Sequence, residues 1–582
     1  MRDLNFSGWR NNAAARIPAV PLLGLLLLVL AWVLPGLIGH QPWKPDEGYT
    51  FGLVQHIAAS GDWVVPMLAG EPFMEKPPIF FITASWCLQA FGGVLPLHDA
   101  ARLAAGIWLS IALAGLALAA RLVYGKQAGR WAIVVALGCL GLPLRAHQLI
   151  TDIALFAGIA WGLYAKLLAP SRPVLAGVLL GVAGAVALLA KGLLGPGLIG
   201  LTALVLPLLS PTYRNRRYAW TLGLALLVGL PLPALWMWSL YQRSADLFNL
   251  WLWVNNLGRF NGTAHLGPHA QHLFYFRTLP WYAFPALPLA LLALWRARRG
   301  TVRIAGSALL PVLLAFGVGL TVLSLAADAR ELYAMPLLAP LAILAVGALV
   351  EYPQPVLRWR IASAVTLLLS VVLVALIVVC GFALASGAPA GLAHWLVTRR
   401  FIGWQPAWYW QGWLAYALIL ALVLGFWRAV SAGTPAGFAW RWFLLVVALW
   451  GGLSTLWLPA FDHVMRYRET FLQLQPRLAQ LQQQQQCVAS YRFGEPQRAM
   501  LDYYDHFRTL RVETQPAAWN CRWLLVGSED GQLPAAVTAR QLQPVQIAVR
   551  PGDARDRFML FQLPGTVNEL WPQDEIRRAV GK

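Results

Sequence analysis

Charge is scarce in this sequence of 582 residues. Only 12% of the residues are charged and only 25 are acidic, whereas 58% are hydrophobic. A soluble globular domain carries roughly 25% charged residues, so that class of protein is excluded. The sequence contains many apolar runs close to the roughly 20 residues that cross a bilayer, and 29 tryptophans, a residue enriched at membrane interfaces. The chain is therefore predicted to be a polytopic membrane protein.

Several common motifs are also missing. The five cysteines form no C-x-x-C pair, which excludes a disulfide scaffold and the usual zinc motifs. No G-x-x-x-x-G-K-[ST] segment is present, so nucleotide hydrolysis is not expected. No G-x-S-x-G segment supports a serine nucleophile. No period of roughly 20 to 50 residues recurs, which argues against a solenoid or a duplicated transporter.

The formal charge of +20 has two interpretations. Basic clusters on a soluble domain would indicate nucleic-acid binding, whereas basic loops between apolar runs reflect membrane orientation and attraction to anionic lipid. The basic residues lie mostly in short loops between apolar runs, so we expect membrane lipids and no nucleic acid as partners.

About 13 apolar runs are long enough to cross a membrane. They lie near 17–38, 101–122, 131–149, 152–170, 173–190, 192–211, 219–241, 279–296, 303–325, 334–350, 361–386, 412–427 and 439–459. Every second loop between them is basic, which places the N-terminus in the cytoplasm. The other loops, with the first loop at 39–100, and the C-terminal part then lie outside.

The C-terminal part changes character. Residues 461–582 hold short strand-like pieces and a helical stretch near 495–507, which predicts a small external α/β domain after a transmembrane domain at 1–460. Cys487 and Cys521 both fall in it. A disulfide between them, worth about 3 kcal/mol in the chain-entropy model, and two free thiols both remain open.

The acidic residues gather in the segment 43–78. Asp46 follows Pro45 and is predicted to begin a short helix, where a carboxylate is favourable even without a catalytic role. Glu47 is next to it. Glu75 and Lys76 stand side by side before two prolines, and a lysine there suits a phosphate, although a solvated charged turn would have the same composition.

Further candidates lie in the other external loops. Asp152 begins an apolar run, and Lys191 sits in the run LLAKGLLGPG, where it either binds an anion or extends its amine to the membrane surface. The loop 242–278 holds Arg259 and three histidines, which either ligate a metal with an outside carboxylate or are interfacial polar residues. Cations that hold a phosphate, beside a carboxylate that acts as a base or stabilises positive charge, suit a charged lipid-linked substrate.

The ordered set of motifs resembles the integral-membrane glycosyltransferases that use polyprenyl-phosphate sugars, above all the ArnT-type lipid A aminoarabinose transferases, which are related to the protein O-mannosyltransferases. The resemblance covers roughly residues 40–340. It is carried by Asp46-Glu47, SGDWVVPMLAGEPFMEKPP at 60–78, AAR at 100–102, Asp152, LAKG at 189–192, GRF at 258–260, His269 and RELYAMPLLAP at 330–340.

The resemblance implies an all-α polytopic membrane fold of the GT-C class, with about 13 transmembrane helices and a small periplasmic α/β domain. It implies Asp46 as the catalytic residue, with Asp152 close by. It also implies a site for substrate and carrier phosphate that is made by Glu47, Glu75, Lys76, Lys191, Arg259 and Tyr333. The sequence identifies no cofactor, and a divalent cation held by Glu75 and His269 is left open.

The sequence departs from the family motifs at two places, and both bear on which sugar and acceptor the protein uses. The family motif D-E-x-R-Y becomes Asp46-Glu47-Gly48-Tyr49-Thr50 here, so Tyr49 replaces an arginine, and Asn255-Asn256 replaces a Glu-His pair. We therefore expect an inverting glycosyltransferase of the bacterial inner membrane. It would move a sugar from undecaprenyl phosphate to an acceptor at the periplasmic face, with an amino-arabinose-like sugar and lipid A phosphate favoured. Another sugar or a protein or glycan hydroxyl acceptor, and a transporter or flippase for a lipid-linked anion, are the alternatives.

Overall fold

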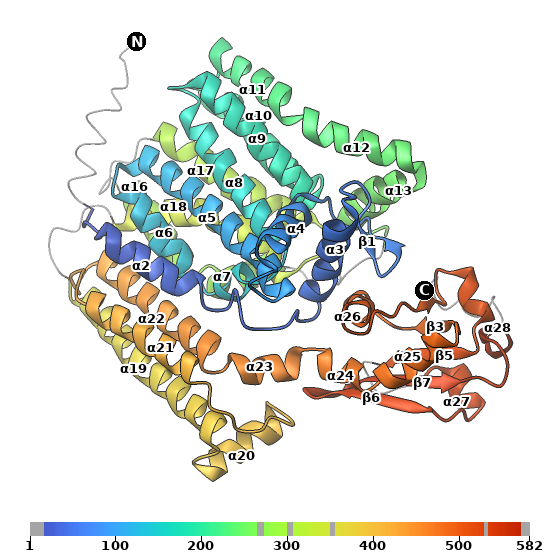
Figure 1. The fold of residues 1–582 in the computed structure, drawn as a ribbon. Helices are drawn as coiled ribbons and strands as arrows, with labels where there is room; N and C mark the ends of the chain where they lie inside the picture. The colour runs from blue at the N-terminus through green and yellow to red at the C-terminus, as the bar shows by residue number, and fades with distance from the viewer. Residues whose placement is uncertain (1–16, 265–272, 300–305, 350–355, 529–532, 572–582) are drawn as a thin grey trace.

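The structure is a computed structural model. It describes residues 17–264, 273–299, 306–349, 356–528 and 533–571, and every structural statement below concerns these residues. Most of the described chain is helical (Figure 1). The polytopic all-α architecture with a small sheet region is therefore confirmed.

Seven helices within the described ranges are long and apolar enough to cross a membrane, and a bent pair of helices would make eight. The seven are α5 (Leu97–Tyr124), α9 (Pro173–Lys191), α11 and α12 together (Arg216–Arg243), α17 (Ala308–Leu325 of Gly306–Leu325), α18 with the short turn before it (Glu331–Leu349), α19 (Leu357–Ser386) and α22 (Pro435–Thr455). The bent pair is α15 (Phe274–Tyr282) and α16 (Ala286–Arg298), which meet at 96°.

The other predicted runs contain shorter helices. These are α2 (Leu22–Val33), α6 (Ala128–Leu137), α8 (Asp152–Leu168), α10 (Leu194–Leu209) and α21 (Trp410–Phe426). The sequence predicts about 13 membrane-spanning runs, whereas seven or eight described helices have the full length. The two numbers differ because glycine, proline and polar residues end helices inside several of the runs. After α6, for example, the chain continues through Gly138 and a short helix α7 (Leu142–Ala146) before Asp152 begins α8.

The C-terminal strands form one five-stranded sheet with the order β4-β3-β5-β7-β6. β3 (Val488–Tyr491) pairs in parallel with β4 (Leu510–Arg511) and β5 (Trp523–Ser528), while β7 (Asp553–Gln562) pairs antiparallel with β5 and β6 (Gln546–Arg550). The helix α26 (Glu495–Asp505) connects β3 to β4. Parallel neighbours require such a crossover. The predicted helix near 495–507 and the predicted α/β character of this region are confirmed.

The sheet region lies at one end of the helix bundle, where α26 packs on α3 (Asp46–Ser60) (Figure 1). The first loop is bonded to it at two places. Near the start of the loop, Lys44 donates to Asp556 at 2.8 Å and Tyr504 donates to Gln41 at 2.6 Å. Further along, Glu71 of the hairpin β1–β2 (Met67–Leu68 and Glu71–Pro72) accepts hydrogen bonds from the sheet region. The two parts of the chain therefore share one surface.

Cys487 and Cys521 form a disulfide, so of the two interpretations left open above the bridged one is confirmed. The bridge joins the start of β3 to the start of β5 across 34 residues. In the chain-entropy model a loop of this length stabilises the sheet region by about 3 to 4 kcal/mol.

The double variant Cys487→Ser/Cys521→Ser should therefore show faster amide hydrogen exchange throughout β3, β5 and β7, measured by mass spectrometry on the full chain. Cys139→Ser, at a buried free cysteine among the helices, is the control and should leave exchange in the strands unchanged. Equal exchange in the double variant and the unmodified chain would contradict a stabilising role of the bridge.

Candidate active site

The helix α3 carries the first acidic residues of the site. It begins at Asp46 and ends at Ser60, and Gly61 follows with a φ of 68°, which suits glycine just after a helix. Asp46 and Glu47 both occupy the first turn, where carboxylates are stabilised by the helix dipole. Because they are adjacent on a helix, their side chains point in different directions, and the structure gives them different surroundings.

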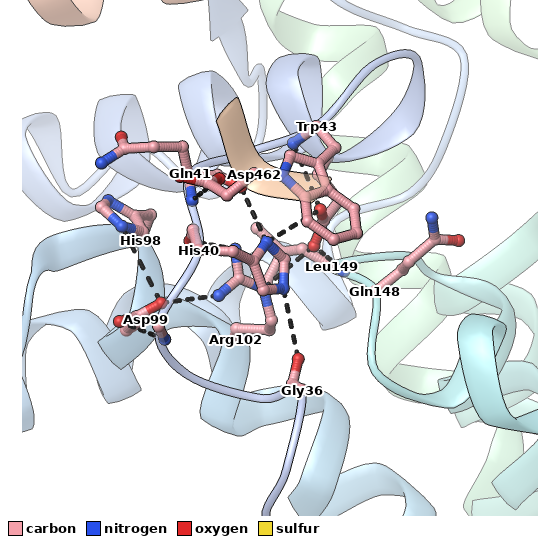
Figure 2. Close-up of polar contacts among 12 residues, drawn as sticks. Gly36, His40, Gln41, Trp43, His98, Asp99, Arg102, Gln148, Leu149 and Asp462 are labelled. Carbon is pink, nitrogen blue, oxygen red and sulfur yellow. Dashed lines mark hydrogen bonds and ion pairs between the residues drawn. The ribbon is translucent and has the colours of Figure 1, made fainter. Parts of the chain in front are cut away.

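Glu47 is buried at 1% exposure beside Arg102, which is equally buried. Its Oε1 accepts from Arg102 Nε at 3.0 Å and from the backbone N–H of Leu149 at 3.1 Å, while Oε2 accepts from the backbone N–H of Trp43 at 3.2 Å. Figure 2 shows Arg102 at the centre of this cluster. Its remaining N–H groups donate to Asp99 at 2.7 Å and to the carbonyls of Leu37 and His40 at 3.1 Å.

This cluster joins three separate segments, namely the first loop, α5 and the turn that leads to Asp152. Breaking a buried ion pair by removing one partner costs roughly 3 to 5 kcal/mol. Glu47 is therefore placed to hold α3 against the start of α8, which sets the positions of Asp46 and Asp152 relative to each other. It does not line the cavity described next, so the geometry gives it no direct contact with a carrier phosphate.

Five of the predicted residues surround one cavity of about 320 Å³. It lies between the end of the first loop, α9, α10, the segment 255–260 and α17. One end is polar and the other is apolar. The lining residues are Glu75, Lys76, Lys191, Leu193, Leu194, Gly197, Leu201, Asn255, Asn256, Leu257, Arg259, Phe260, Val322, Leu323, Ala326, Asp328 and Tyr333.

The charges at the polar end are paired. Arg259 Nη1 is bonded to Glu75 Oε1, and Lys76 is the neighbour of Glu75 in the chain. Burial alone would raise the pKa of Glu75, but the ammonium of Lys76 and the guanidinium of Arg259 outweigh it and lower this pKa to about 2. Burial would lower the pKa of Lys76, yet Glu75 and Asp46 raise it. Both groups therefore carry their charges at neutral pH.

Asp152 is paired with Lys191, whose Nζ lies 2.7 Å from both carboxylate oxygens. The same ammonium stands 4.6 Å from the centre of the Tyr333 ring. Lys191 ends α9, and Gly192 follows with a φ of +67°. A Cβ at Gly192 would lie 2.0 Å from Oδ1 of Asn256, so the glycine lets the segment at 256 approach and helps to shape this wall. Lys191 is thus held in an ion pair at the cavity wall.

Asp46 lies beside this cavity and not among its lining residues. Its Oδ1 accepts from the hydroxyl of Tyr49 at 3.0 Å, and Lys76 is bonded to the same hydroxyl. The structure thus brings together Asp46, Glu75, Lys76, Lys191, Arg259, Tyr333 and, through Lys191, Asp152.

Three further charged residues lie near the site but were not among the candidates predicted from the sequence. Asp328 and Arg330 face each other at 3.6 Å near Arg259 and Tyr333. Glu495 begins α26 in the sheet region, and the adjacent Pro496 packs on α3, because a Cβ at Gly48 would lie 3.0 Å from that of Pro496. Burial raises the pKa of Glu495 and the negative charge of Glu75 raises it further. Glu495 is about 450 residues from Asp46 along the chain, so no local pattern in the sequence predicts that it lies near the first loop.

The metal hypothesis is not supported by the described residues, among which no group of three or more His, Cys, Asp or Glu could hold a metal ion. His269, with His265 and His272, lies outside the described residues. Glu75, the other candidate ligand, is bonded to Arg259. The side chain of Asn255 donates to the carbonyl of Met74. The side chain of Asn256 accepts from the backbone N–H of Leu193 and donates to the carbonyl of Trp251.

The cavity continues into an apolar groove between α10 and α17. This second hollow, of about 440 Å³, shares Leu201 and Val322 with the first. From Val322 it follows α17 to Leu310, which is about 18 Å at about 1.5 Å per residue. A charged pocket thus borders an open apolar groove that runs along a helix long and apolar enough to cross a membrane.

Comparison with known proteins supports this architecture. No protein-family model matches the chain. The solved structure of ArnT from Cupriavidus metallidurans bound to undecaprenyl phosphate superposes with a TM-score of 0.64 at 18% identity, covering 93% of this chain and 97% of that one. The chain has the fold of ArnT. The resemblance to ArnT-type glycosyltransferases that the motifs predict is confirmed.

Curated relatives carry related names. The chain is 28% identical over 339 residues to undecaprenyl phosphate-alpha-4-amino-4-deoxy-L-arabinose arabinosyl transferase 2 of Sodalis glossinidius (strain morsitans), covering 56% of this chain and 58% of that protein. It is 27% identical over 584 residues to the transferase of Pseudomonas aeruginosa (strain UCBPP-PA14), covering 93% and 94%. The chain spans 58% and 60% of the length of the first two relatives it matches.

Glu71 supplies a test of how the sheet region is docked beside this site. It accepts from Arg498, Arg511 and Thr514, each at 3.0 Å. Burial would raise the pKa of Glu71, but the two arginines outweigh it and hold this pKa below the ordinary 4.5. Its stabilising contribution is therefore complete above about pH 4.5 and is lost as the pH falls through the lower folded value.

We expect Glu71→Gln to lower the temperature of thermal unfolding at about pH 7, and the difference from the unmodified chain to shrink towards about pH 3. The control is Asp502→Asn. Asp502 lies on α26 and pairs with the exposed Arg508, so this variant should have little effect on the unfolding temperature at either pH. A difference that is constant with pH would contradict the role of the Glu71 charge.

Proposed function

We propose that the protein is an inverting glycosyltransferase that moves a sugar from undecaprenyl phosphate to an acceptor at the outer face of the inner membrane. The observation that carries this proposal is the continuity of a cationic pocket with an apolar groove. An ordinary soluble sugar donor has no use for such a groove. A phosphate carried on a long hydrocarbon chain matches both parts.

The pocket suits a phosphate monoester or diester at its polar end. Lys76, Lys191 and Arg259 converge there, and the hydroxyl of Tyr333, which donates to Asp328 at 3.3 Å, stands beside them. The guanidinium group of arginine and the ammonium group of lysine commonly neutralise phosphate charge in proteins. Lys76 and Arg259 would stabilise the charge that develops on the carrier phosphate as it leaves.

The reaction is a single displacement. The acceptor oxygen forms a bond to the anomeric carbon while the bond from that carbon to the carrier phosphate oxygen breaks, and undecaprenyl phosphate leaves with the electron pair. A phosphate acceptor is already nucleophilic, and Asp46 would orient it or stabilise positive charge on the sugar. A hydroxyl acceptor would lose its proton to Asp46 as general base.

The sugar is proposed from the names of the relatives, and the acceptor from the family resemblance. Their names specify 4-amino-4-deoxy-L-arabinose on undecaprenyl phosphate, and an amino sugar carries a positive charge. Glu75, Asp152 and Glu495 supply carboxylates around the cavity, which suit such a sugar better than an acidic one. We propose an amino-arabinose-like sugar and a lipid A phosphate as the acceptor. The same chemistry with another sugar, or with a protein or glycan hydroxyl, is the second candidate.

The orientation is part of the proposal. The first loop and the sheet region lie at one end of the bundle (Figure 1), and the alternation of basic loops along the sequence predicts that this end is external. This supports a periplasmic active site, a periplasmic domain at 461–582 and a cytoplasmic N-terminus.

A transporter or flippase for a lipid-linked anion is the alternative from another class. Such a protein would place its charges through the depth of the membrane, whereas the paired charges described above collect at one end. Purified protein that releases free undecaprenyl phosphate from a lipid-linked sugar would exclude transport as the sole activity. Mass spectrometry of lipid A and envelope glycans, with and without the gene, would identify the sugar and its acceptor together.

Asp46→Asn should abolish transfer, because the amide can neither accept a proton nor supply negative charge, while the protein remains folded in the membrane. The assay is release of undecaprenyl phosphate by purified protein in nanodiscs. Asp62→Asn is the matched control, since Asp62 is a first-loop carboxylate that is bonded to Arg243 and to the backbone of Val64 and Val65. Near-normal transfer by Asp46→Asn would remove Asp46 from the mechanism.

Lys76→Met and Arg259→Met should each weaken the binding of undecaprenyl phosphate by roughly tenfold or more, the effect of losing one charge-assisted hydrogen bond. Arg243→Met, which removes an external arginine far from the cavity lining, should bind as tightly as the unmodified protein. If all three variants bind equally, the cavity is not the carrier-phosphate site.

A further inference from the structure

Tyr49 is one of the residues at which this chain departs from the family motif given above, and the proposed function assigns it no role. It is 5% exposed, and its ring stacks on Phe73 at 5.4 Å between centroids. It does not line the carrier cavity. A tyrosine placed there only for packing would need no particular partner for its hydroxyl. The hydroxyl has two, and both are charged.

One partner is Asp46, whose Oδ1 lies 3.0 Å from Tyr49 Oη. The other is Lys76, whose Nζ is bonded to the same oxygen. An ammonium can only donate hydrogen bonds, and an ionised carboxylate can only accept them. The single hydroxyl proton must therefore point at Asp46, and the oxygen must accept from Lys76. Hydrogen positions need not be observed for this direction to be determined.

The hydroxyl keeps its proton at any pH of interest. Burial raises the pKa of Tyr49 well above its ordinary value of 10.0, and the negative charges of Asp46 and Glu75 raise it further. Tyr49 is thus a permanent neutral donor to Asp46. Donation by Lys76 polarises the hydroxyl, and polarised chains of hydrogen bonds strengthen one another in a buried setting.

We propose that Tyr49 is a positioning residue that holds Asp46 in its working orientation and couples it to the carrier-phosphate site through the chain Lys76–Tyr49–Asp46. The inference rests on the proposed function, in which Lys76 binds the carrier phosphate. A phosphate that enters the cavity competes with the tyrosine oxygen for the ammonium protons. Arrival of the donor therefore weakens the polarisation of the hydroxyl and frees Asp46 to act on the acceptor.

The coupling predicts opposite effects on binding and turnover. In Tyr49→Phe the ring and its stacking on Phe73 remain, but Asp46 loses its donor and Lys76 loses its acceptor. The turnover number should fall by roughly 10- to 100-fold, the loss expected for one hydrogen bond to a charged group in the transition state. Undecaprenyl phosphate should bind at least as tightly as to the unmodified protein, because Lys76 no longer shares a proton with the tyrosine.

The experiment compares full-length Tyr49→Phe with Tyr504→Phe, both in nanodiscs. Tyr504 is also partly buried, and its hydroxyl donates to Gln41 at 2.6 Å, but it touches neither Asp46 nor Lys76. Binding is measured with undecaprenyl phosphate, and turnover is measured as its release from a lipid-linked amino sugar. Tyr504→Phe should match the unmodified protein in both.

Two results would overturn the proposal. Turnover by Tyr49→Phe within about threefold of the unmodified protein would show that the hydroxyl is dispensable. A parallel loss of turnover and of undecaprenyl phosphate binding would show a purely structural role, since a loosened site weakens both. Failure of the proposed function is distinguishable from either, because the unmodified protein itself would then release no undecaprenyl phosphate.

Discussion

A buried charge must be paired or hydrogen-bonded, and this constraint organises the whole site. Arg102 is the clearest case, because it is 1% exposed and yet each side of its guanidinium has a partner. Those partners come from the loop before α3, from α3 itself and from α5. The cost of leaving any of them unpaired is what keeps α3 in place, and α3 carries Asp46.

The same rule extends outward from this centre. Asp152 and Lys191 form a pair, Glu75 and Arg259 form another, and Glu71 is enclosed by Arg498 and Arg511. Each pair joins segments that are distant in the sequence. In a bundle whose helices pack mainly through apolar and small residues, these pairs supply the directional contacts that apolar packing lacks. A polar cavity with defined walls can therefore form beside a membrane-spanning core.

The sheet region is part of this arrangement. It contributes Glu495 near the cavity and holds the first loop at two places, through Asp556 bonded to Lys44 and through Arg498 bonded to Glu71. A region that follows the last long apolar helix, α22, thus contributes to the surroundings of residues near the start of the chain.

Much of this could be predicted because membrane insertion leaves a strong signature in sequence. Apolar length and the alternation of basic loops are local or nearly local properties, and each of the predicted runs contains a helix in the structure. Asp46, Glu75, Lys76, Lys191 and Arg259 could be named as candidates because charges at a membrane surface are costly and because their pattern resembles a family motif. For Glu47 the structure adds what its adjacency to Asp46 could not show, namely that its carboxylate is bonded to the buried Arg102.

The sequence by itself determined the membrane class, the helical architecture and the identity of the charged residues, because each depends on composition or on short-range pattern. Only the tertiary structure decided which charges pair with one another. It turned Glu47 away from the cavity, joined Cys487 to Cys521, and placed Tyr49 between Asp46 and Lys76. Pairing depends on side-chain direction and on contacts between distant segments, and neither is written in the spacing of residues along the chain.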